Sequence, residues 1–343
     1  MSLAIVPFTA DHLDAAAALL AARHRRDRAW VPALSPVYED PAAARPVLDD
    51  LLTADGGCGV VALRDGAVVS YLLGAPVLRS PTDVFAGFTH PRAAEIPYEG
   101  HAADPADGAN LYPRLYAVLA QEWVSHGLVG HYITIPANPD SSEPWWDLGF
   151  GRYIALSGRA TTPSAEHESR NGMDITTRRA TPDDAEAVQA LTTEFFRTVA
   201  APPIFVPFLP ETAAERQRFV ADHLADPGCP VWLAFADDRL VGLQLFVEPT
   251  SSQWHQSPLA TPQRAVYLFI VCTVPEARSS GVGAAFANRT LAWAREAGYD
   301  HCTAHYLTTS RANPFWRGLG FQPVSYGLFR AVDERVIWAD GRI

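Results

Sequence analysis

The sequence of 343 residues contains no lysine: its 27 basic side chains other than histidine are all arginine. P-loop nucleoside triphosphatases hold the β- and γ-phosphates with a lysine, and protein kinases use a strand lysine for a similar purpose. Enzymes that form a Schiff base, including those that depend on pyridoxal phosphate, need a lysine amine. The absence of lysine therefore excludes all three classes.

Cysteine is also scarce, and its four occurrences (Cys58, Cys229, Cys272 and Cys302) form no CxxC pair. This spacing favours scattered core thiols over a disulfide framework or a zinc site, and we expect no metal. The sequence has no apolar run of about 18 residues and no charged-then-apolar leader, so we expect a cytoplasmic protein that does not contact a membrane. A net charge of −11 argues against a nucleic-acid partner, which requires a basic face.

The sequence repeats one plan twice. Three landmarks recur: a Thr-capped helix start, two β-like runs around a tight acidic turn, and an aromatic pair a few positions before Gly-Phe. They lie at residues 8–20 and 180–192, at 60–74 and 232–246, and at 145–153 and 315–323. An offset of 172 residues at the first two landmarks, and of 171 between the Gly-Phe pairs at Gly149 and Gly320, indicates a tandem duplication.

A polar stretch separates the two copies. The segment GRATTPSAEHESRNGM, Gly158 to Met173, contains proline and glycine but no apolar period, which is typical of a linker. We therefore predict a first copy at residues 1–158, a linker at 159–172 and a second copy at 173–343. Strands mixed with helices predict an α+β fold, with a sheet that is antiparallel in its hairpin and parallel where a helix crosses over.

A glycine loop in the second copy, PEARSSGVGAAFANRTL (Pro275 to Leu291), lies between a predicted strand and a predicted helix. A dinucleotide fingerprint needs a small residue where Phe286 stands, and a Walker loop needs lysine. The remaining pattern, Arg278-x-x-Gly281-x-Gly283, lets the backbone approach an anion, and the first amides of the helix have no internal partners. It predicts a pyrophosphate site, with an ordinary helix start as the alternative.

The segments on either side of this loop carry a family resemblance. VYLFIVCTVPEAR leads into the loop, and ANPFWRGLGFQPV follows its helix with an Asn and an aromatic pair before Gly-Phe. In this order the motifs resemble the GCN5-related N-acetyltransferase (GNAT) superfamily, over residues 177–343 and more weakly in the first copy. The resemblance implies two tandem acyl-CoA N-acyltransferase folds, each a mixed, largely antiparallel sheet flanked by helices.

The resemblance also implies that acetyl-CoA binds between two splayed parallel strands of the second copy. By position, the cofactor-binding residues are Val271, Cys272, Thr273, Arg278, Ser279, Ser280, Gly281, Val282, Gly283, Ala284, Asn313 and Trp316. The strand residues would pair with the pantetheine arm, the loop would hold the pyrophosphate, and Asn313 would lie near the sulfur.

The implied reaction is direct attack of a small-molecule amine on the thioester, with a base for the amine and an acid for the departing thiolate. Many family members carry a tyrosine as the acid where this chain has Trp316, which leaves Tyr306 and Tyr326 as substitutes. Candidate bases are Glu248 and Tyr267. Because no base is evident, a non-catalytic acyl-CoA-binding or sensor protein is the alternative.

The acceptor itself is less defined by the sequence. APPIFVPFLP (Ala201 to Pro210), together with Trp254 and His255, suggests an apolar pocket that bears aromatic rings, and a plain surface loop is the alternative. Two fused copies can mimic the dimer that single-domain members form, so we expect a monomer or a dimer.

The first copy has lost the loop. The offset places Ala106 or Asp107 under Arg278, within HAADPADGANLYPRL, where glycines are lost or shifted and carboxylates have entered. A carboxylate repels a pyrophosphate by roughly 1 kcal/mol per charge pair at about 4 Å even in water. We therefore predict a degenerate first copy that packs against the second copy and walls its acceptor pocket. We interpret its basic run HRRDR, His24 to Arg28, as a solvated helix end, with a phosphate-binding patch as the alternative.

Overall fold

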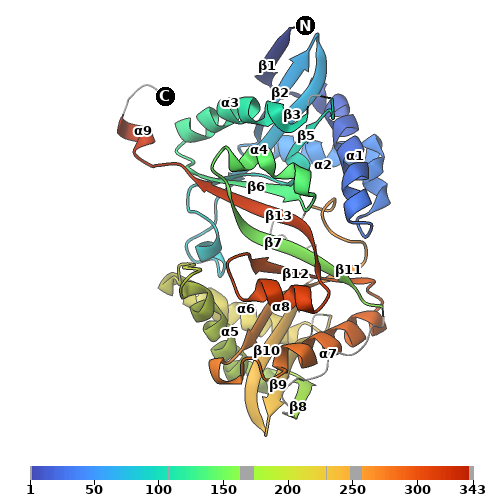
Figure 1. Cartoon of the computed structure of the whole chain (residues 1–343). Coiled ribbons are helices and arrows are strands. Elements are labelled where there is room, and N and C mark those ends of the chain that lie inside the picture. Colours follow the sequence, from blue (N-terminus) through green and yellow to red (C-terminus); the bar gives the residue numbers. More distant parts are fainter. Residues whose placement is uncertain (1, 107, 163–173, 229, 248–256, 340–343) are drawn as a thin grey trace.

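The computed structural model describes residues 2–106, 108–162, 174–228, 230–247 and 257–339. Within them a sheet of 13 strands runs through both copies, in the order β1-β2-β3-β4-β6-β13-β7-β12-β11-β10-β9-β8, and β5 pairs with β3. The molecule is elongated along this sheet (Figure 1). Of the strand pairs, β4 with β6 and β11 with β12 are parallel and the others are antiparallel, which confirms the mixed, largely antiparallel fold.

In the first copy, helices cover both faces of the sheet. Its strands are β1 (Leu3–Pro7), β2 (Cys58–Arg64), β3 (Ala67–Val77), β4 (Ala93–Ile96), β5 (His101–Ala103), β6 (Gly130–Pro136) and β7 (Gly151–Ala160). Its helices are α1 (Leu13–Trp30), α2 (Pro41–Thr53), α3 (Tyr112–Ser125) and α4 (Glu143–Trp146). Side chains of α1 and α2 belong to one buried apolar cluster and those of α3 and α4 to another.

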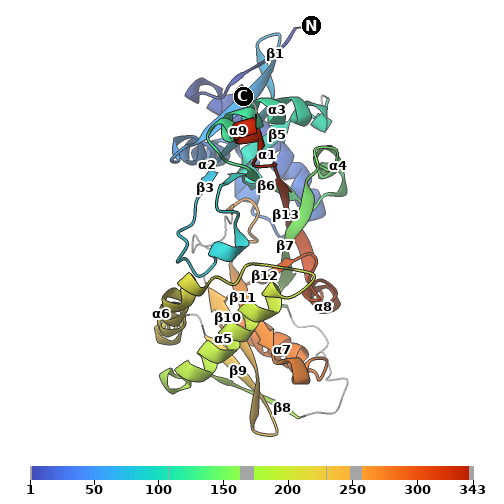
Figure 2. The same cartoon turned by 90° about the vertical axis from the view of Figure 1, so that its left-hand side faces the viewer.

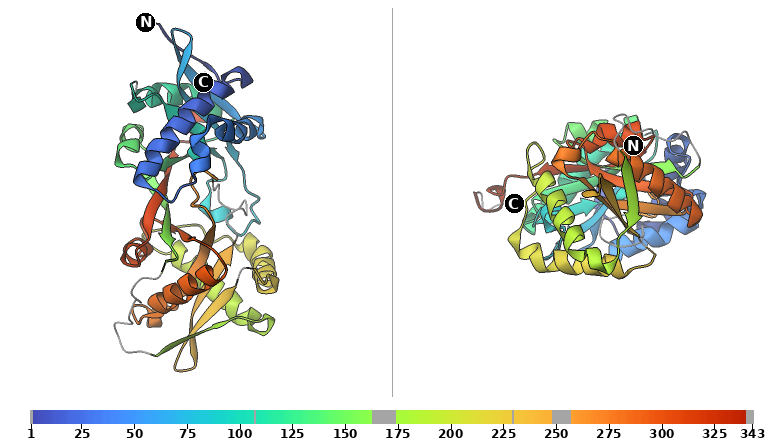
Figure 3. Two further views of the ribbon diagram at one scale, coloured as in Figure 1. Left: turned by 90° about the vertical axis from the view of Figure 1, so that its right-hand side faces the viewer. Right: turned by 90° about the horizontal axis from the view of Figure 1, so that it is seen from below.

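The second copy repeats this arrangement. Its strands are β8 (Ile175–Arg179), β9 (Val231–Ala236), β10 (Arg239–Val247), β11 (Ala265–Thr273), β12 (His301–Leu307) and β13 (Gln322–Ala331). Its helices are α5 (Ala185–Ala200), α6 (Ala213–Ala225), α7 (Val282–Glu296), α8 (Ala312–Gly318) and α9 (Val336–Ala339). In Figure 3, α6 and α7 lie on opposite sides of the strands. Among the described residues, no helix combines the length and the apolar character needed to cross a membrane.

Equivalent elements begin at the predicted offset. Helices α1 and α5 begin at residues 13 and 185, and strands β4 and β11 at residues 93 and 265, both 172 apart. Strands β6 and β12 begin at residues 130 and 301, and β7 and β13 at residues 151 and 322, both 171 apart. The tandem duplication that the sequence indicates is therefore present in the structure.

The two predicted hairpins are β2–β3 and β9–β10, and each turns on residues with left-handed backbone. Asp65 and Gly66 have φ of 49° and 87°, and Asp237 and Asp238 have φ of 47° and 62°. Glycine adopts this conformation freely and aspartate tolerates it better than most residues, so the acidic turns specify the short connections.

The last strand of each copy lies in a shared central part of the sheet. Strand β7 of the first copy pairs with β12 of the second, and Leu156 faces His305 in that register. Strand β13 of the second copy pairs with β6 of the first, and Leu328 faces Ile133. Strand β7 also extends to Ala160, so the predicted boundary at residue 158 falls inside a strand; the division into two domains stays a prediction.

Two loops also cross between the copies. The connection from β3 to β4 carries Phe85 into the second copy, where its ring centroid lies 4.7 Å from that of Phe269 (Figure 2). The segment before β11 crosses the other way: Pro262 forms a β-bridge with Leu34, and Gln263 donates a hydrogen bond of 2.9 Å to the hydroxyl of Ser35. Each copy therefore completes the other's interior.

Candidate functional site

The parallel strands β11 and β12 diverge in the middle of the second copy. They pair from Ala265 to Leu268 against residues 301–304, and beyond that point both strands continue unpaired with each other. A cavity of about 510 Å³ lies at the divergence. Its lining includes Tyr267 and Val271 of β11, Tyr306 of β12 and Trp316 of α8. This is the opening that the sequence predicts.

The predicted strand residues fall on two sides of β11. Val271 lines the cavity, whereas Cys272 is 5% exposed and packs with the apolar cluster under α5 and α6. Burial raises the pKa of the Cys272 thiol to about 12, so it remains protonated. The carbonyl of Thr273 accepts a hydrogen bond of 3.4 Å from Nε of Arg278. Of the three, only Val271 presents its side chain to the cavity.

The glycine loop joins the cavity to the start of α7. Arg278 lines the cavity and donates a hydrogen bond of 3.1 Å to the hydroxyl of Thr198 at the end of α5. Ser279 and Gly281 have φ of 64° and 100°, which turn the chain sharply into the helix. The amide of Ala285 bonds the carbonyl of Gly281 at 3.0 Å, so the helix amides before it have no intrahelical acceptor.

The other loop residues have structural partners. Ser280 is buried, and its hydroxyl donates a hydrogen bond of 2.5 Å to the carbonyl of Ala277. A Cβ atom on Gly283 would lie 2.5 Å from the ring of Phe315, so a larger residue there would displace this ring. Residues Ser279, Ser280, Gly281, Val282, Gly283 and Ala284 do not line the cavity itself but follow Arg278 at its edge.

Helix α8 supplies the aromatic pair. Trp316 is 5% exposed and lines the cavity, with its ring centroid 4.9 Å from those of Phe315 and Phe321. Asn313 is half-buried, its amide bonds the carbonyl of Ser310 at 3.4 Å, and its side chain is not part of the lining.

Two of the candidate catalytic tyrosines reach the cavity. Tyr306 is 5% exposed and lies in hydrogen-bonding distance of Ser157 of β7, whose Oγ donates to its Oη at 3.0 Å. Sequence reasoning missed Ser157, because it belongs to the other copy and lies 149 residues away. Tyr267 is buried against His305, with ring centroids 5.0 Å apart. Burial raises the pKa of the Tyr267 phenol well above its usual value, which argues against its role as a base.

Three further candidates, Glu248, Trp254 and His255, lie outside the described residues. His305 lines the cavity, and burial lowers the pKa of its imidazole to about 3, so the ring is neutral. Among the described residues, no group of three or more His, Cys, Asp or Glu side chains is arranged to hold a metal ion.

The equivalent place in the first copy is filled by side chains. Strands β4 and β6 pair over residues 93–96 and 130–133, in the same register as β11 and β12. Beyond that point the buried ring of His101 contacts the carbonyl of Thr134 at 3.1 Å and the hydroxyl of Tyr112 at 3.3 Å. Tyr112 in turn stacks on Trp145, with ring centroids 5.2 Å apart. This chain of contacts occupies the divergence.

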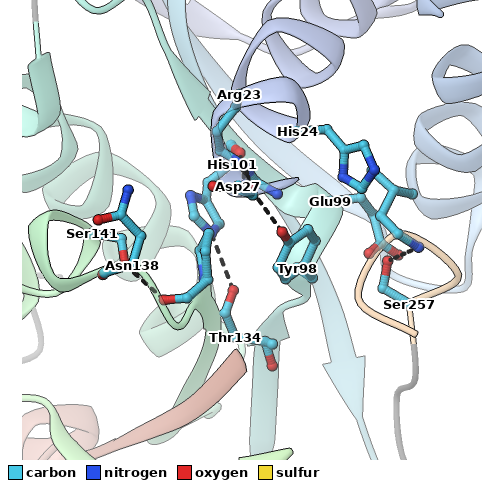
Figure 4. Close-up of polar contacts among 12 residues, drawn as sticks. Arg23, His24, Asp27, Tyr98, Glu99, His101, Thr134, Asn138, Ser141 and Ser257 are labelled. Carbon is cyan, nitrogen blue, oxygen red and sulfur yellow. Dashed lines mark hydrogen bonds and ion pairs between the residues drawn. The ribbon is translucent and has the colours of Figure 1, made fainter. Parts of the chain in front are cut away.

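Charged groups complete the filling (Figure 4). Nε of Arg23 lies 3.2 Å from the carboxylate of Asp27, and the hydroxyl of Tyr98 donates to the same carboxylate at 2.6 Å. The guanidinium also lies over the Tyr98 ring, 4.5 Å from its centroid. Arg23, His24 and Asp27 are 6%, 0% and 3% exposed, so the interpretation of this run as a solvated helix end is wrong for its inner face.

Comparisons with known proteins agree with the fold. Residues 188–321 match the model of the Acetyltransferase (GNAT) family. The matched range contains β11, the glycine loop, α7 and β12, so the similarity to the GNAT family lies in the second copy. A search of curated protein sequences gives no match.

Solved structures extend the likeness to the whole chain. A GCN5-related N-acetyltransferase from Sphaerobacter thermophilus is similar at a TM-score of 0.57 and 15% identity, over 96% of this chain and 95% of that one. A glucosamine N-acetyltransferase region of a fungal multi-domain β-N-acetylglucosaminidase is similar at 0.55 and 12% identity, over 96% of this chain and 38% of that one. A tandem GNAT protein from the clavulanic acid pathway has a TM-score of 0.46 and 14% identity, over 96% and 98%. At these identities the first two show the fold.

Proposed function

We propose that this protein transfers the acetyl group of acetyl-CoA to the amine of a small molecule, and that the second copy carries the reaction. The observation that carries the proposal is the cavity at the divergence of β11 and β12, which opens beside the start of α7. An extended pantetheine arm fits between diverging strands, and a pyrophosphate fits the start of a helix.

The charges around the cavity support an anionic donor. Arg197, Arg278 and Arg311 all border it, and none of the three forms an ion pair among the described residues. Guanidinium groups pair well with phosphate oxygens, so three of them at one opening suit a ligand that carries phosphates.

The proposed chemistry needs one bond formed and one broken. The amine nitrogen attacks the thioester carbonyl, the carbon–sulfur bond breaks, and the product is an amide and free CoA. Tyr306 is placed to give its phenolic proton to the departing thiolate, while Ser157 donates a hydrogen bond to the phenolic oxygen. The amine loses its proton to a base, for which Glu248 remains the candidate.

A second function has one specific observation in its favour. Trp316 stands where many family members have an acidic tyrosine, and an indole N–H is a poor acid. A protein of this kind that binds acyl-CoA without turnover, as a sensor does, would keep the cavity and the arginines but would not need Tyr306.

One experiment separates the two functions. The full chain is incubated with acetyl-CoA and a panel of primary amines, and release of free thiol is followed. Amine-dependent release supports acetyl transfer. Binding of acetyl-CoA by calorimetry with no release for any amine supports the sensor, and failure of acetyl-CoA to bind contradicts both.

A further inference from the structure

The wall of the cavity that faces α5 is aromatic and comes from both copies. Phe269 and Leu307 line it from β11 and β12. Phe85 and Phe88 line it from the loop that the first copy extends into the second, and Ile154 lines it from β7. Figure 2 shows this loop of the first copy beside α5 and α6. We call these five side chains the aromatic chamber.

The cavity is larger than an acetyl group alone requires. The whole cavity measures about 510 Å³. An apolar cavity of about 150 Å³ is enough to hold a benzene ring. A second cavity of about 80 Å³ lies behind the first, and the two share Phe88, Ile154 and His305 in their linings. The space therefore suits a ring-sized apolar body next to the thioester.

One carboxylate is available to an incoming amine. Among the described residues that line the cavity, Glu194 of α5 is the acidic one, and it is half-buried. A carboxylate at the edge of an apolar site attracts a protonated amine, which then loses its proton before it attacks. An apolar acyl chain would gain no favourable interaction from this carboxylate.

We propose that the acceptor is a primary amine with an apolar, aromatic body. Its ring lies in the aromatic chamber against Phe88 and Phe269, and its ammonium group enters past Glu194. This assignment rests on the proposed acetyl transfer. It makes the first copy, which supplies Phe85, Phe88 and Ile154, the part of the protein that selects the acceptor.

The test compares phenethylamine with ethanolamine as acceptors for acetyl-CoA, with thiol release as the measurement. Burial of a phenyl ring leads us to expect roughly 30-fold higher kcat/KM for phenethylamine. Equal kcat/KM for the two amines overturns the chamber as the acceptor site but leaves acetyl transfer standing.

Variants locate the effect. Phe88→Ala should lower kcat/KM for phenethylamine roughly tenfold without changing the affinity for acetyl-CoA. Phe8→Ala is the matched control, because Phe8 is as buried as Phe88 in the same copy, at 6% and 7% exposed, and does not line the cavity. If Phe88→Ala fails to fold, Ile154→Phe is used instead. It narrows the chamber without removing apolar contact and should also lower kcat/KM for phenethylamine. An unchanged kcat/KM for phenethylamine in the folded variants contradicts the proposal.

Two measurements separate this inference from the proposed function. Calorimetry of phenethylamine with the CoA complex reports the chamber without turnover: binding supports it even if acetyl transfer fails, and no binding overturns it. A series of acyl-CoA donors tests the other occupant. If octanoyl-CoA is preferred to acetyl-CoA with ethanolamine as acceptor, the chamber holds the acyl chain and the proposal is wrong.

Discussion

The two copies hold equivalent strands in the same register and differ in what lies where the strands diverge. In the second copy Phe195 and Val271 line a cavity. With an offset of 172, the equivalent residues of the first copy are Arg23 and Glu99, which lie among buried polar side chains (Figure 4). The difference teaches that a duplicated fold keeps an opening beyond the paired strand residues only where side chains leave that place empty.

The helix starts beside the two places also differ. Helix α7 follows a glycine at its N-cap, whereas α3 begins with Tyr112 and Pro113, and proline has no N–H to offer a ligand. The start of α3 therefore offers fewer free amides to a ligand than the start of α7, and buried polar side chains fill the place that corresponds to the cavity.

The largest expected effect is a loss of stability when one of the buried polar side chains of the first copy is removed. Asp27→Ala leaves the buried guanidinium of Arg23 without its carboxylate, which should cost about 3 to 5 kcal/mol in the free energy of unfolding. Urea unfolding measures it. Asp14→Ala is the control, because the Asp14 side chain is 87% exposed beside Arg45, and it should change stability by less than about 1 kcal/mol. Equal effects would contradict the structural role of the filling.

The next effect concerns chemistry in the second copy. Tyr306→Phe removes the proposed proton donor and should lower kcat roughly 100-fold while the KM for acetyl-CoA changes little. The control is Tyr326→Phe, since Tyr326 packs under the guanidinium of Arg152 at 4.3 Å and does not line the cavity. A larger loss in the control would move the donor to Tyr326.

A third change gives the second copy a feature of the first. Ala284→Glu places a carboxylate in the first turn of α7, which suits the helix dipole but repels a pyrophosphate. We expect at least a roughly tenfold weaker affinity for acetyl-CoA by calorimetry and no loss in Tm of the ligand-free protein. Ala284→Gln should bind acetyl-CoA nearly normally, and an equal loss there would assign the effect to bulk instead of charge.

The smallest expected effect comes from a hydrogen bond between the two copies. Ser157→Ala removes the hydrogen bond to Tyr306 and should lower kcat about fivefold with an unchanged KM for acetyl-CoA. A purely structural role would instead lower Tm with no change in kcat of the folded enzyme, and that result would contradict the positioning of Tyr306 by the first copy.

Much of the fold follows from local sequence. The hairpins, the strand before the glycine loop and the helix after it lie where apolar periods and turn residues predict them. The pairing of β7 with the second copy and of β13 with the first could not be predicted. The two strands have similar residue patterns, and the local sequence does not specify which neighbouring strand each one joins. The same limit applies to the site. Val271, Arg278 and Trp316 were predicted at the cavity, whereas Phe85 and Phe88 reach it from the other copy, and Ser157 of that copy contacts Tyr306.

Because β7 pairs with β12 and β6 pairs with β13, two strands of the first copy are synthesised well before their partners. Ser157 leaves the ribosome 149 residues before Tyr306, its partner across β7 and β12. At about 5 to 20 residues per second, on the order of ten seconds pass between them. During that interval β6 and β7 present unpaired backbone edges, which other chains can join. The first copy is therefore translated first but completed last, and a chain shortened before Gln322 would lack the strand that joins β6 to β7.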